Sequence, residues 1–275
     1  MPSNEQRRQA AKRKLERRLA HQAARAKRNR RVALIASVAS VIVVVGAVYL
    51  IATSGDEEQQ PAAQGNQSDA CEFPAAQEGT QQVAKEVNPP ENTQPEREGT
   101  VSATMETNQG TIPITLDRSK APCTVESMAG LVEQQYFNDT SCHRVTTSDG
   151  LKVLQCGDPS GSGAGGPGYT VPDEPPEDLE PAPESSEQQE VSVYPRGTLA
   201  MANSGSPNSG GSQFFMVYGD SKLPPDYTVF GSIDEEGLRT LDKIAKNGVE
   251  PADGQPAEDG APAKPVDIST VELAA

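Results

Sequence analysis

Residues 32–53 form an uncharged run, VALIASVASVIVVVGAVYLIAT, and this run constrains the chain more than any other feature. A helix rises 1.5 Å per residue, so these 22 residues reach about 33 Å, slightly more than the bilayer's hydrocarbon core of about 30 Å. A buried helix of a globular core is rarely both this long and apolar on every face. A cleaved signal peptide is the main alternative, although its apolar region is usually shorter and no small-x-small cleavage motif follows here. We therefore predict a transmembrane helix over 32–53.

The charge distribution gives this predicted helix an orientation. Residues 1–31 hold 12 of the chain's 24 Lys and Arg but only two of its 39 acidic residues, so the other residues carry a net charge of −25. Because basic residues flank the cytoplasmic end of a span, we predict a basic cytoplasmic arm at 1–31, with everything after residue 53 outside the cell membrane. The basic side chains are expected to lie on anionic lipid, so nucleic acid is not a predicted partner.

Four cysteines follow the predicted span, in a compartment that permits disulfides. They are Cys71, Cys123, Cys142 and Cys156. No two of them have CxxC spacing, and the two histidines, His21 and His143, fall on opposite sides of the predicted span. A zinc site needs ligands that converge, so we predict no metal site, and no motif calls for a cofactor.

Composition divides the outer part into a linker and a folded domain. Residues 54–99 are rich in Gln, Glu, Pro, Asn and Ala and lack periodic apolar positions, so we predict a disordered linker there. The folded domain is predicted over 100–275. Within it, 174–190 and 250–263 are acidic, proline-containing segments that we interpret as solvated, disordered loops. A surface that binds cations or the cell wall is the alternative interpretation of these loops.

Short apolar runs separated by turn residues dominate the predicted domain. Two such runs flank Thr-Asn-Gln-Gly at 107–110, which predicts a hairpin. Two helices are predicted, one with Pro122 in its first turn and one over 235–247, with Gly248 after its last turn. Many short strands with two well-separated helices indicate a mainly β domain, a barrel capped at its ends. The expected strands are 102–106, 111–116, 142–146, 151–155, 198–202, 213–218, 229–233 and 266–273.

The run Gln-Phe-Phe-Met-Val-Tyr at 213–218 carries two adjacent phenylalanines. Successive side chains of a strand point to opposite faces of its sheet. Phe214 is therefore predicted to face one side with Met216, and Phe215 the other side with Gln213. One ring must face away from the core that its neighbour fills, which indicates a second apolar surface on the outer side of this strand.

Common hydrolase and nucleotide-binding motifs are missing from the sequence. There is no G-x-S-x-G turn between a predicted strand and a helix. The glycine run GSGAGGPG at 161–168 lacks the Lys-Ser/Thr that ends a phosphate-binding loop. A Ser–His–Asp triad outside the membrane would have to use His143, the only histidine on that side. We therefore expect neither hydrolysis nor nucleotide chemistry.

Several short motifs follow one another in a recognisable order. His143-Arg144 precedes Gln-Cys-Gly-Asp at 155–158, the glycine run, Leu-Ala-Met-Ala-Asn at 199–203, Gly-Ser-Gln-Phe-Phe at 211–215 and Val-Phe-Gly at 229–231. Over about 100–275 this order resembles the cyclophilin family of peptidyl-prolyl cis–trans isomerases. With its arm, span and linker, the whole chain resembles the membrane-anchored cyclophilins of high-GC Gram-positive bacteria. The resemblance implies an eight-stranded antiparallel closed β-barrel capped by two α-helices, and an isomerase that assists the folding of exported proteins.

The chemistry of such an isomerase suits these residues. Rotation about an X–Pro bond has a barrier of roughly 20 kcal/mol, and lowering it requires no covalent bond to the protein. A fixed hydrogen-bond donor near the proline nitrogen stabilises the twisted amide more than the planar one. The resemblance gives this catalytic role to Arg144, oriented by Gln155. It also implies a set of residues that bind proline-containing polypeptides: Met201, Ala202, Asn203, Gln213, Phe215, Leu223, Tyr227 and Gly163.

The sequence departs from the family pattern around the predicted pocket. Ten residues separate Arg144 from Gln155, three more than in the family pattern. The pocket phenylalanine expected just before Gln155 is missing, and Leu151 or Val153 is the candidate replacement. Tyr227 takes the place of a histidine of the groove. A tethered module that binds proline peptides with little turnover is therefore the alternative function.

The resemblance also bears on an inhibitor and on the cysteines. Lys222 aligns with a tryptophan that favours cyclosporin binding, so we expect cyclosporin to bind weakly. Cys142 and Cys156 would lie on neighbouring antiparallel strands, which makes a disulfide between them plausible. Cys123 could compete for either partner, so the pairing stays open. The pocket interpretation further predicts that Phe215 lies near Arg144 and Met201 and that Phe214 does not.

Overall fold

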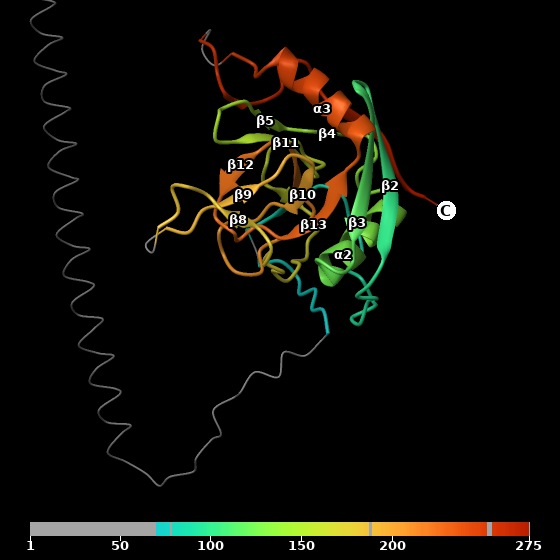
Figure 1. Cartoon of the computed structure of the whole chain (residues 1–275). Coiled ribbons are helices and arrows are strands. Elements are labelled where there is room, and N and C mark those ends of the chain that lie inside the picture. The colour runs from blue at the N-terminus through green and yellow to red at the C-terminus, as the bar shows by residue number, and fades with distance from the viewer. Residues whose placement is uncertain (1–69, 78, 187–188, 252–254, 275) are drawn as a thin grey trace, which may run out of the picture. The chain divides into compact units, whose positions relative to one another are not determined.

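The computed structural model describes residues 70–77, 79–186, 189–251 and 255–274 (Figure 1). The predicted cytoplasmic arm at 1–31 and the predicted transmembrane helix at 32–53 lie outside the described residues. None of the helices within the described part of the chain combines the length and the apolar character needed to cross a bilayer.

Two helices and a large antiparallel sheet make up most of the domain. The helices are α2 (Pro122–Glu133), which contacts β15, β13 and β3, and α3 (Glu235–Asn247), which contacts β3 and β11 (Figure 1). The sheet order is β14-β5-β6-β11-β10-β13-β3-β2-β15-β4. Its strands are β2 (Thr100–Thr107), β3 (Gly110–Asp117), β4 (Thr140–Ser141), β5 (Arg144–Thr146), β6 (Lys152–Cys156), β10 (Thr198–Met201), β11 (Phe214–Gly219), β13 (Val229–Ile233), β14 (Asp259–Gly260) and β15 (Asp267–Leu273).

Two smaller sheets flank the large one. One pairs β1 with β7 in parallel, and the other has the order β12-β9-β8. Their strands are β1 (Gln82–Val83), β7 (Gly165–Gly166), β8 (Glu180–Pro181), β9 (Ser192–Tyr194) and β12 (Ser221–Leu223).

The sheet differs from the expected closed barrel of eight strands. Its described part has ten strands and two ends, β14 and β4, so the hydrogen-bonded sheet is curled and open. The break falls where Cys142 and His143 separate β4 from β5. Cys142 N donates to Val266 O at 2.9 Å, next to β15, whereas Arg144 already pairs with β6. Residues 142 and 143 therefore connect the two ends of the open sheet, from β4 beside β15 to β5 beside β6. The mainly β architecture with two helices is confirmed.

Two turn signals in the sequence are confirmed. The β2–β3 hairpin turns at 107–110, where the Thr107 hydroxyl accepts hydrogen bonds from the N–H groups of Gln109 and Gly110, both at 3.1 Å. Gly110 has a φ of +138°, a conformation that favours glycine. The C-terminal end of α3 is likewise Gly248, with a φ of +77°.

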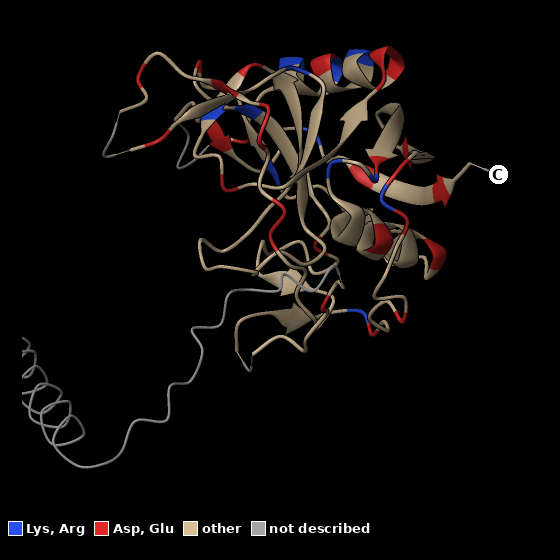
Figure 2. Cartoon of the chain, turned by 60° about the horizontal axis from the view of Figure 1, so that its bottom comes forward, with Lys and Arg blue, Asp and Glu red and all other residues tan. Residues whose placement is uncertain are grey.

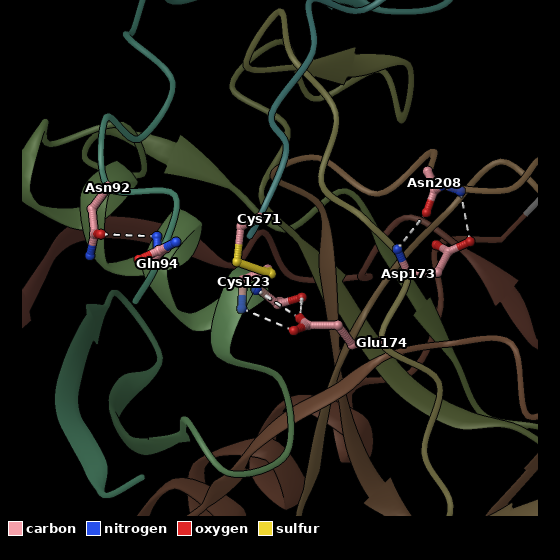
Figure 3. The surroundings of a disulfide bond; sticks show 8 residues. Cys71, Asn92, Gln94, Cys123, Asp173, Glu174 and Asn208 are labelled. Carbon is pink, nitrogen blue, oxygen red and sulfur yellow. Dashed lines mark hydrogen bonds between the residues drawn. A yellow bond between two sulfur atoms is a disulfide. The ribbon is translucent and has the colours of Figure 1, made fainter. Parts of the chain in front are cut away.

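An acidic residue of the 174–190 segment caps the start of α2 (Figure 3). The Glu174 carboxylate accepts hydrogen bonds from the N–H groups of Cys123 and Thr124, both at 2.9 Å, and from the Thr124 hydroxyl at 2.7 Å. The first N–H groups of a helix have no partner inside the helix, and a carboxylate there also interacts favourably with the helix dipole. Farther along this segment, β8 pairs with β9. The described part of the segment is therefore built into the domain and is not the disordered loop that the sequence predicted.

The acidic residues are distributed widely over the described chain. Figure 2 shows them on loops and on both helices. Two lysines pair with acids of the 174–190 segment: Lys120 Nζ lies 2.7 Å from Asp178, and Lys222 Nζ lies 2.8 Å from Glu184. The segment is thus tied to the domain by charge as well as by strand pairing.

The predicted linker also differs from the structure in its C-terminal part. Cys71 is fully buried and forms a disulfide with Cys123 of α2 (Figure 3). Lys85 Nζ donates three hydrogen bonds of 2.7–3.0 Å to backbone carbonyls just after α2. These contacts use a disulfide and main-chain polar groups, which leave no periodic apolar pattern in the sequence. The folded domain therefore extends at least to residue 70, where the sequence predicted a boundary near 100.

Apolar side chains cluster on both faces of the sheet at β11. Phe214 and Met216 belong to the main core, where the Phe214 ring lies edge-on to Phe137 with 5.7 Å between ring centroids. Phe215 and Val217 belong to a second, smaller cluster. The alternation predicted for 213–218 is confirmed.

Candidate active site

Arg144 and Gln155 face each other across the antiparallel pair β5–β6. They are directly paired in the ladder, and Gln155 is in turn paired with Phe215 on β11. Side chains directly opposite each other on neighbouring strands lie on the same face of the sheet. The register therefore brings a cation, an amide and an aromatic ring together on the outer face.

A row of side-chain amides links Arg144 to the glycine loop. Arg144 Nη1 donates to Gln155 Oε1 at 3.2 Å, and Gln155 Nε2 donates to Gln213 Oε1 at 2.9 Å. Gln213 Nε2 then donates to the carbonyls of Gly163 and Gly165, at 3.0 and 2.9 Å. Each amide satisfies its neighbour, so the orientation of the guanidinium is coupled to the conformation of the loop.

Asp259 holds the other edge of the same guanidinium. Arg144 Nε donates to Asp259 Oδ1 and Arg144 Nη2 donates to Asp259 Oδ2, both at 2.7 Å. These hydrogen bonds raise the pKa of Arg144 above its ordinary value and lower the pKa of Asp259 below its ordinary value. Asp259 was not predicted from the sequence, because it belongs to the 250–263 segment that was interpreted as a solvated loop.

An apolar pocket of about 140 Å³ opens beside Arg144. The Phe215 ring lies edge-on to Tyr227, with 5.5 Å between ring centroids. Phe215 is only 5 % exposed, although it faces the outer surface. The residues that line the pocket are Arg144, Leu151, Val153, Gln155, Ala202, Asn203, Phe215, Leu223 and Tyr227. Both candidate replacements for the missing pocket phenylalanine, Leu151 and Val153, lie in this lining.

Tyr194 supports the pocket from below and was not predicted. Its ring is fully buried and lies 6.3 Å from that of Phe215, measured between centroids. Its hydroxyl shares its one hydrogen between the carbonyls of Pro224 and Tyr227, at 3.1 and 3.2 Å, and accepts a hydrogen bond from Tyr227 N at 3.2 Å. Burial raises the pKa of Tyr194. The neutral phenol thus fixes the loop that carries Tyr227 into the pocket.

A second cavity, of about 160 Å³, adjoins the pocket and is lined by the glycine loop. The loop is organised by Asp158, whose carboxylate accepts hydrogen bonds from the N–H groups of Ser160, Gly163 and Gly165 at 2.7–3.0 Å. Burial alone would raise the pKa of Asp158, but the hydrogen bonds from the Ser160 hydroxyl and from these N–H groups outweigh it and lower that pKa. A Cβ on Gly165 would come within 1.8 Å of Asp158 Oδ1, so this position requires glycine.

Sequence comparisons place this arrangement in a family. The family model described as cyclophilin type peptidyl-prolyl cis-trans isomerase/CLD matches residues 102–273. The chain belongs to this family. Among curated relatives, the cyclophilin is 52 % identical over 204 residues to a "Probable peptidyl-prolyl cis-trans isomerase B" of Mycobacterium leprae, which covers 74 % of this chain. It is 57 % identical over 173 residues to the Mycobacterium tuberculosis protein of the same name, which covers 63 % of this chain.

The alignments cover only part of these relatives. The cyclophilin chain spans 66 % of the length of the M. leprae protein and 54 % of the length of the M. tuberculosis protein. Among solved structures, a cyclophilin type isomerase of Cryptosporidium parvum aligns with 64 % of this chain and 99 % of its own, at 24 % identity and a TM-score of 0.49.

The structure brings most of the predicted site residues of this cyclophilin together. Arg144, Gln155, Phe215, Leu223 and Tyr227 line the pocket. Of the remaining predicted residues, Ala202 and Asn203 line both the pocket and the second cavity, and Gln213 and Gly163 line the second cavity. The Asn203 side chain bonds within the protein, since Nδ2 donates to Asp226 O at 2.9 Å and Oδ1 accepts from Gly205 N at 3.0 Å.

Met201 is the exception, and its prediction as a pocket residue is wrong. It is 3 % exposed, belongs to the main core and pairs with Phe214 across β10–β11. Because side chains alternate along β10, Ala200 and Ala202 face outward and Met201 faces inward. The expectation that Phe215 lies near Arg144 is confirmed by their shared pocket. The expectation that Met201 lies near Phe215 and away from Phe214 is wrong, since Met201 pairs with Phe214 and both belong to the main core.

The structure pairs the four cysteines. Cys142 is joined to Cys156, and Cys71 is joined to Cys123. Cys156 directly follows Gln155, and Cys142 precedes Arg144 by two residues, so the Cys142–Cys156 bridge lies beside the paired residues Arg144 and Gln155. The sequence left open whether Cys123 pairs with Cys142 or Cys156. In the structure Cys123 pairs with Cys71, which lies in the segment predicted to be a linker.

Proposed function

We propose that this cyclophilin accelerates cis–trans isomerisation of X–Pro bonds in polypeptides. The observation that carries the proposal is the position of Arg144, whose guanidinium is held by Gln155 on one edge and Asp259 on another while it lines an apolar pocket. Among the described residues that line the pocket, Arg144 is the one with a charged side chain.

The physics of the reaction explains why one fixed cation suffices. In the planar amide the proline nitrogen shares its lone pair with the carbonyl, and this partial double bond gives a barrier of roughly 18–20 kcal/mol. In the twisted state the nitrogen regains the lone pair and becomes a hydrogen-bond acceptor. A donor fixed at that point stabilises the twisted state and does little for the planar one, which is the condition for catalysis. Arg144 remains charged at any physiological pH and has N–H groups to spare.

The pocket suits a proline ring. A protein cavity of about 150 Å³ with apolar walls admits benzene, so the similar volume beside Arg144 can take a five-membered ring. Gln155, Ala202 and Asn203 line both the pocket and the second cavity. A peptide whose proline enters the pocket can therefore place a neighbouring side chain over the glycine loop.

Two-dimensional NMR exchange spectroscopy on an Ala-Pro peptide tests the proposal. Catalytic amounts of the full-length protein should raise the cis–trans exchange rate above that of the free peptide. Phe215→Ala, which removes the wall of the pocket, should abolish the acceleration, and Val83→Ala, a change at an exposed apolar residue outside the pocket lining, should not. Binding of the peptide by the wild type without any acceleration would refute the isomerase and favour a tethered adaptor.

We also propose that residues 32–53 anchor the protein in the cell membrane, with the isomerase domain outside, where it assists the folding of exported proteins. The support is the uncharged run of 22 residues, the basic arm before it and the presence of two disulfides in the domain. Disulfides persist in oxidising compartments and are rare in the cytosol.

Cell fractionation with external protease tests this location. The full-length protein should stay with the membrane in high salt, leave it in detergent, and lose its domain when protease is added to spheroplasts. A double change of Val43 and Val44 to Arg places two charges in the middle of the run, where each costs about 2.5–3.5 kcal/mol on insertion scales, and should release the protein. Val43→Leu is the matched control. A wild-type protein in the soluble fraction, or a domain protected from the protease, would contradict the proposal.

Weak cyclosporin binding is a further part of the proposal. Lys222 does not line the pocket, and its side chain pairs with Glu184 at 2.8 Å. Titration calorimetry should therefore show weaker cyclosporin binding by the wild type than by Lys222→Trp. Equal affinities would contradict the assignment of this position.

A further inference from the structure

We propose that Asp259 is a positioning residue for Arg144, which holds the guanidinium so that its free N–H groups face the proline pocket. This inference rests on the proposed isomerase activity, because it concerns the orientation of the group that acts on the substrate.

The hydrogen bonds of Arg144 divide its five N–H groups between support and substrate. Asp259 takes Nε–H and one hydrogen of Nη2, both at 2.7 Å, and Gln155 takes one hydrogen of Nη1 at 3.2 Å. One N–H on each terminal nitrogen is left for a ligand. A long side chain with several rotatable bonds would otherwise sample many orientations, and a bidentate carboxylate restricts it to one plane.

Backbone pairing places the Asp259 carboxylate. β14 lies antiparallel to β5, with Asp259 opposite Thr146 and Gly260 opposite Val145. Thr147 N donates to Glu258 O at 2.8 Å and extends this pairing by one hydrogen bond. The carboxylate is thus fixed to the strand that carries Arg144, opposite a residue two positions farther along it.

The return of the chain after α3 supports this edge strand. Glu250 N donates to Ala261 O at 2.7 Å, and Ala263 N donates to Gly248 O at 3.0 Å. Gly260 has a φ of +152°, and a Cβ there would lie 3.2 Å from Val249. The described part of the 250–263 segment is therefore a built support for Arg144.

Asp259 acts through Arg144 and does not line the pocket itself. Its side chain is 56 % exposed and that of Arg144 is 38 % exposed. Ion pairs this exposed contribute little to the stability of a fold. A nearby carboxylate also weakens the field of the cation, so removing it has two opposed effects on catalysis. We expect the loss of orientation to be the larger effect, because catalytic groups act through fixed geometry.

The experiment compares Asp259→Asn with Glu258→Gln in the full-length protein. Both variants remove one negative charge from the same exposed segment, but only Asp259 touches Arg144. NMR exchange spectroscopy at saturating peptide gives the catalysed rate, and titration gives the peptide Kd. The ¹⁵N-bound Nε–H signal of Arg144 reports on its hydrogen bond directly, whether or not the protein turns over.

Asp259→Asn should lower the rate at saturation roughly tenfold, less than the hundredfold that a 1 Å misplacement of a catalytic group costs. Its peptide Kd should change less than about twofold, since the lost interaction orients the transition-state donor. Its Arg144 Nε–H signal should broaden by exchange with water. Asp259→Glu should recover part of the rate, and Glu258→Gln should match the wild type in all three measurements.

Equal rates for Asp259→Asn and Glu258→Gln would overturn the inference. A faster Asp259→Asn variant would also overturn it, because Asp259 would then slow the reaction. Asp259→Ala provides the same comparison should the Asn variant fold poorly. If the wild type itself fails to accelerate exchange, the proposed function fails and the inference falls with it. If the wild type is active and Asp259→Asn has the same rate, the positioning role of Asp259 is refuted while the proposed function stands.

Discussion

Phe214 and Phe215 are neighbours in β11, yet they belong to two different parts of the molecule. Phe214 is 1 % exposed and packs edge-on against Phe137 in the main core. Phe215 is 5 % exposed and packs against Tyr194 and Tyr227 on the outer face. The two rings have the same chemistry and nearly the same burial.

Their surroundings separate them. Phe214 and Met201, its partner across β10–β11, both belong to the main apolar core. Phe215 shares its pocket with Arg144 and Gln155, two polar side chains that are hydrogen-bonded to each other. Burial alone therefore does not distinguish a core residue from a binding residue. Fixed polar groups beside an apolar wall do distinguish a binding residue from a core residue. We therefore expect substitutions on the inner face of β11 to affect mainly stability and those on its outer face to affect mainly activity.

The two phenylalanines should differ most in stability. Phe214→Ala leaves a cavity in a closed core and should lower the free energy of unfolding by about 3–5 kcal/mol. Phe215→Ala should cost less, because one side of that ring already borders an open pocket, and it should abolish peptide binding. Urea unfolding and the exchange measurement on both variants give the comparison. An active Phe215→Ala variant that is as unstable as Phe214→Ala would make both rings core residues.

The two disulfides should also differ, one affecting stability alone and the other affecting both stability and activity. Cys71 and Cys123 are 52 positions apart, so replacing both by Ser should cost roughly 4 kcal/mol of stability. Cys142 and Cys156 are 14 positions apart, so replacing both should cost roughly 3 kcal/mol. The first pair lies away from the pocket, so its loss should leave the exchange rate per folded molecule unchanged. The second pair joins the strands of Arg144 and Gln155, so its loss should slow exchange. The reverse assignment of the activity effect would contradict the comparison.

The alternation of side chains along a strand predicted correctly which residues face the core and which face outward, wherever that rule was applied. The alternation at 213–218 placed Phe214 and Phe215 on the right sides. The same rule applied to 199–203 puts Ala202 outward and Met201 inward, and the resemblance overrode it by assigning Met201 to the pocket. The backbone pattern was the better guide at this residue.

Asp259 and the segment before residue 100 could not be predicted, for a physical reason. Asp259 is positioned by the pairing of a two-residue strand, and Lys85 by carbonyls just after α2. Neither interaction needs an apolar repeat, so the sequence around each has the composition of a loop. Cys71 was the one available signal, because a buried disulfide partner implies that its neighbours are ordered.

Stability should also respond to pH through His143, with a smaller effect. Burial lowers the pKa of His143 from its ordinary value of 6.5, and the Nδ1 atom has no hydrogen-bond partner among the described residues. Below about pH 6.5 the unfolded chain binds a proton that the folded one resists, so stability is complete above that pH and falls as the pH drops toward the folded pKa. His143→Gln should flatten this part of the profile in urea unfolding. An unchanged slope would assign the dependence to another group.

Arg196 provides the comparison for the central claim. Its guanidinium is held by Asp242 through two hydrogen bonds, at 2.8 and 3.0 Å, and its side chain is 36 % exposed, against 38 % for Arg144. Arg196 also donates to the carbonyl of Tyr218. It does not line the pocket. Both arginines are thus held by a bidentate carboxylate and are similarly exposed, but only Arg144 lines the pocket.

The most direct measurement is the X–Pro isomerisation rate of Arg144→Ala and Arg196→Ala in a protease-coupled peptide assay. Loss of a single preorganised donor to a transition state costs about a hundredfold or more, so Arg144→Ala should lose at least that factor in kcat/KM. Arg196→Ala should keep the wild-type rate, and both variants should unfold within about 1 kcal/mol of the wild type, as expected for exposed ion pairs. Equal rates for the two variants would contradict the assignment of catalysis to Arg144.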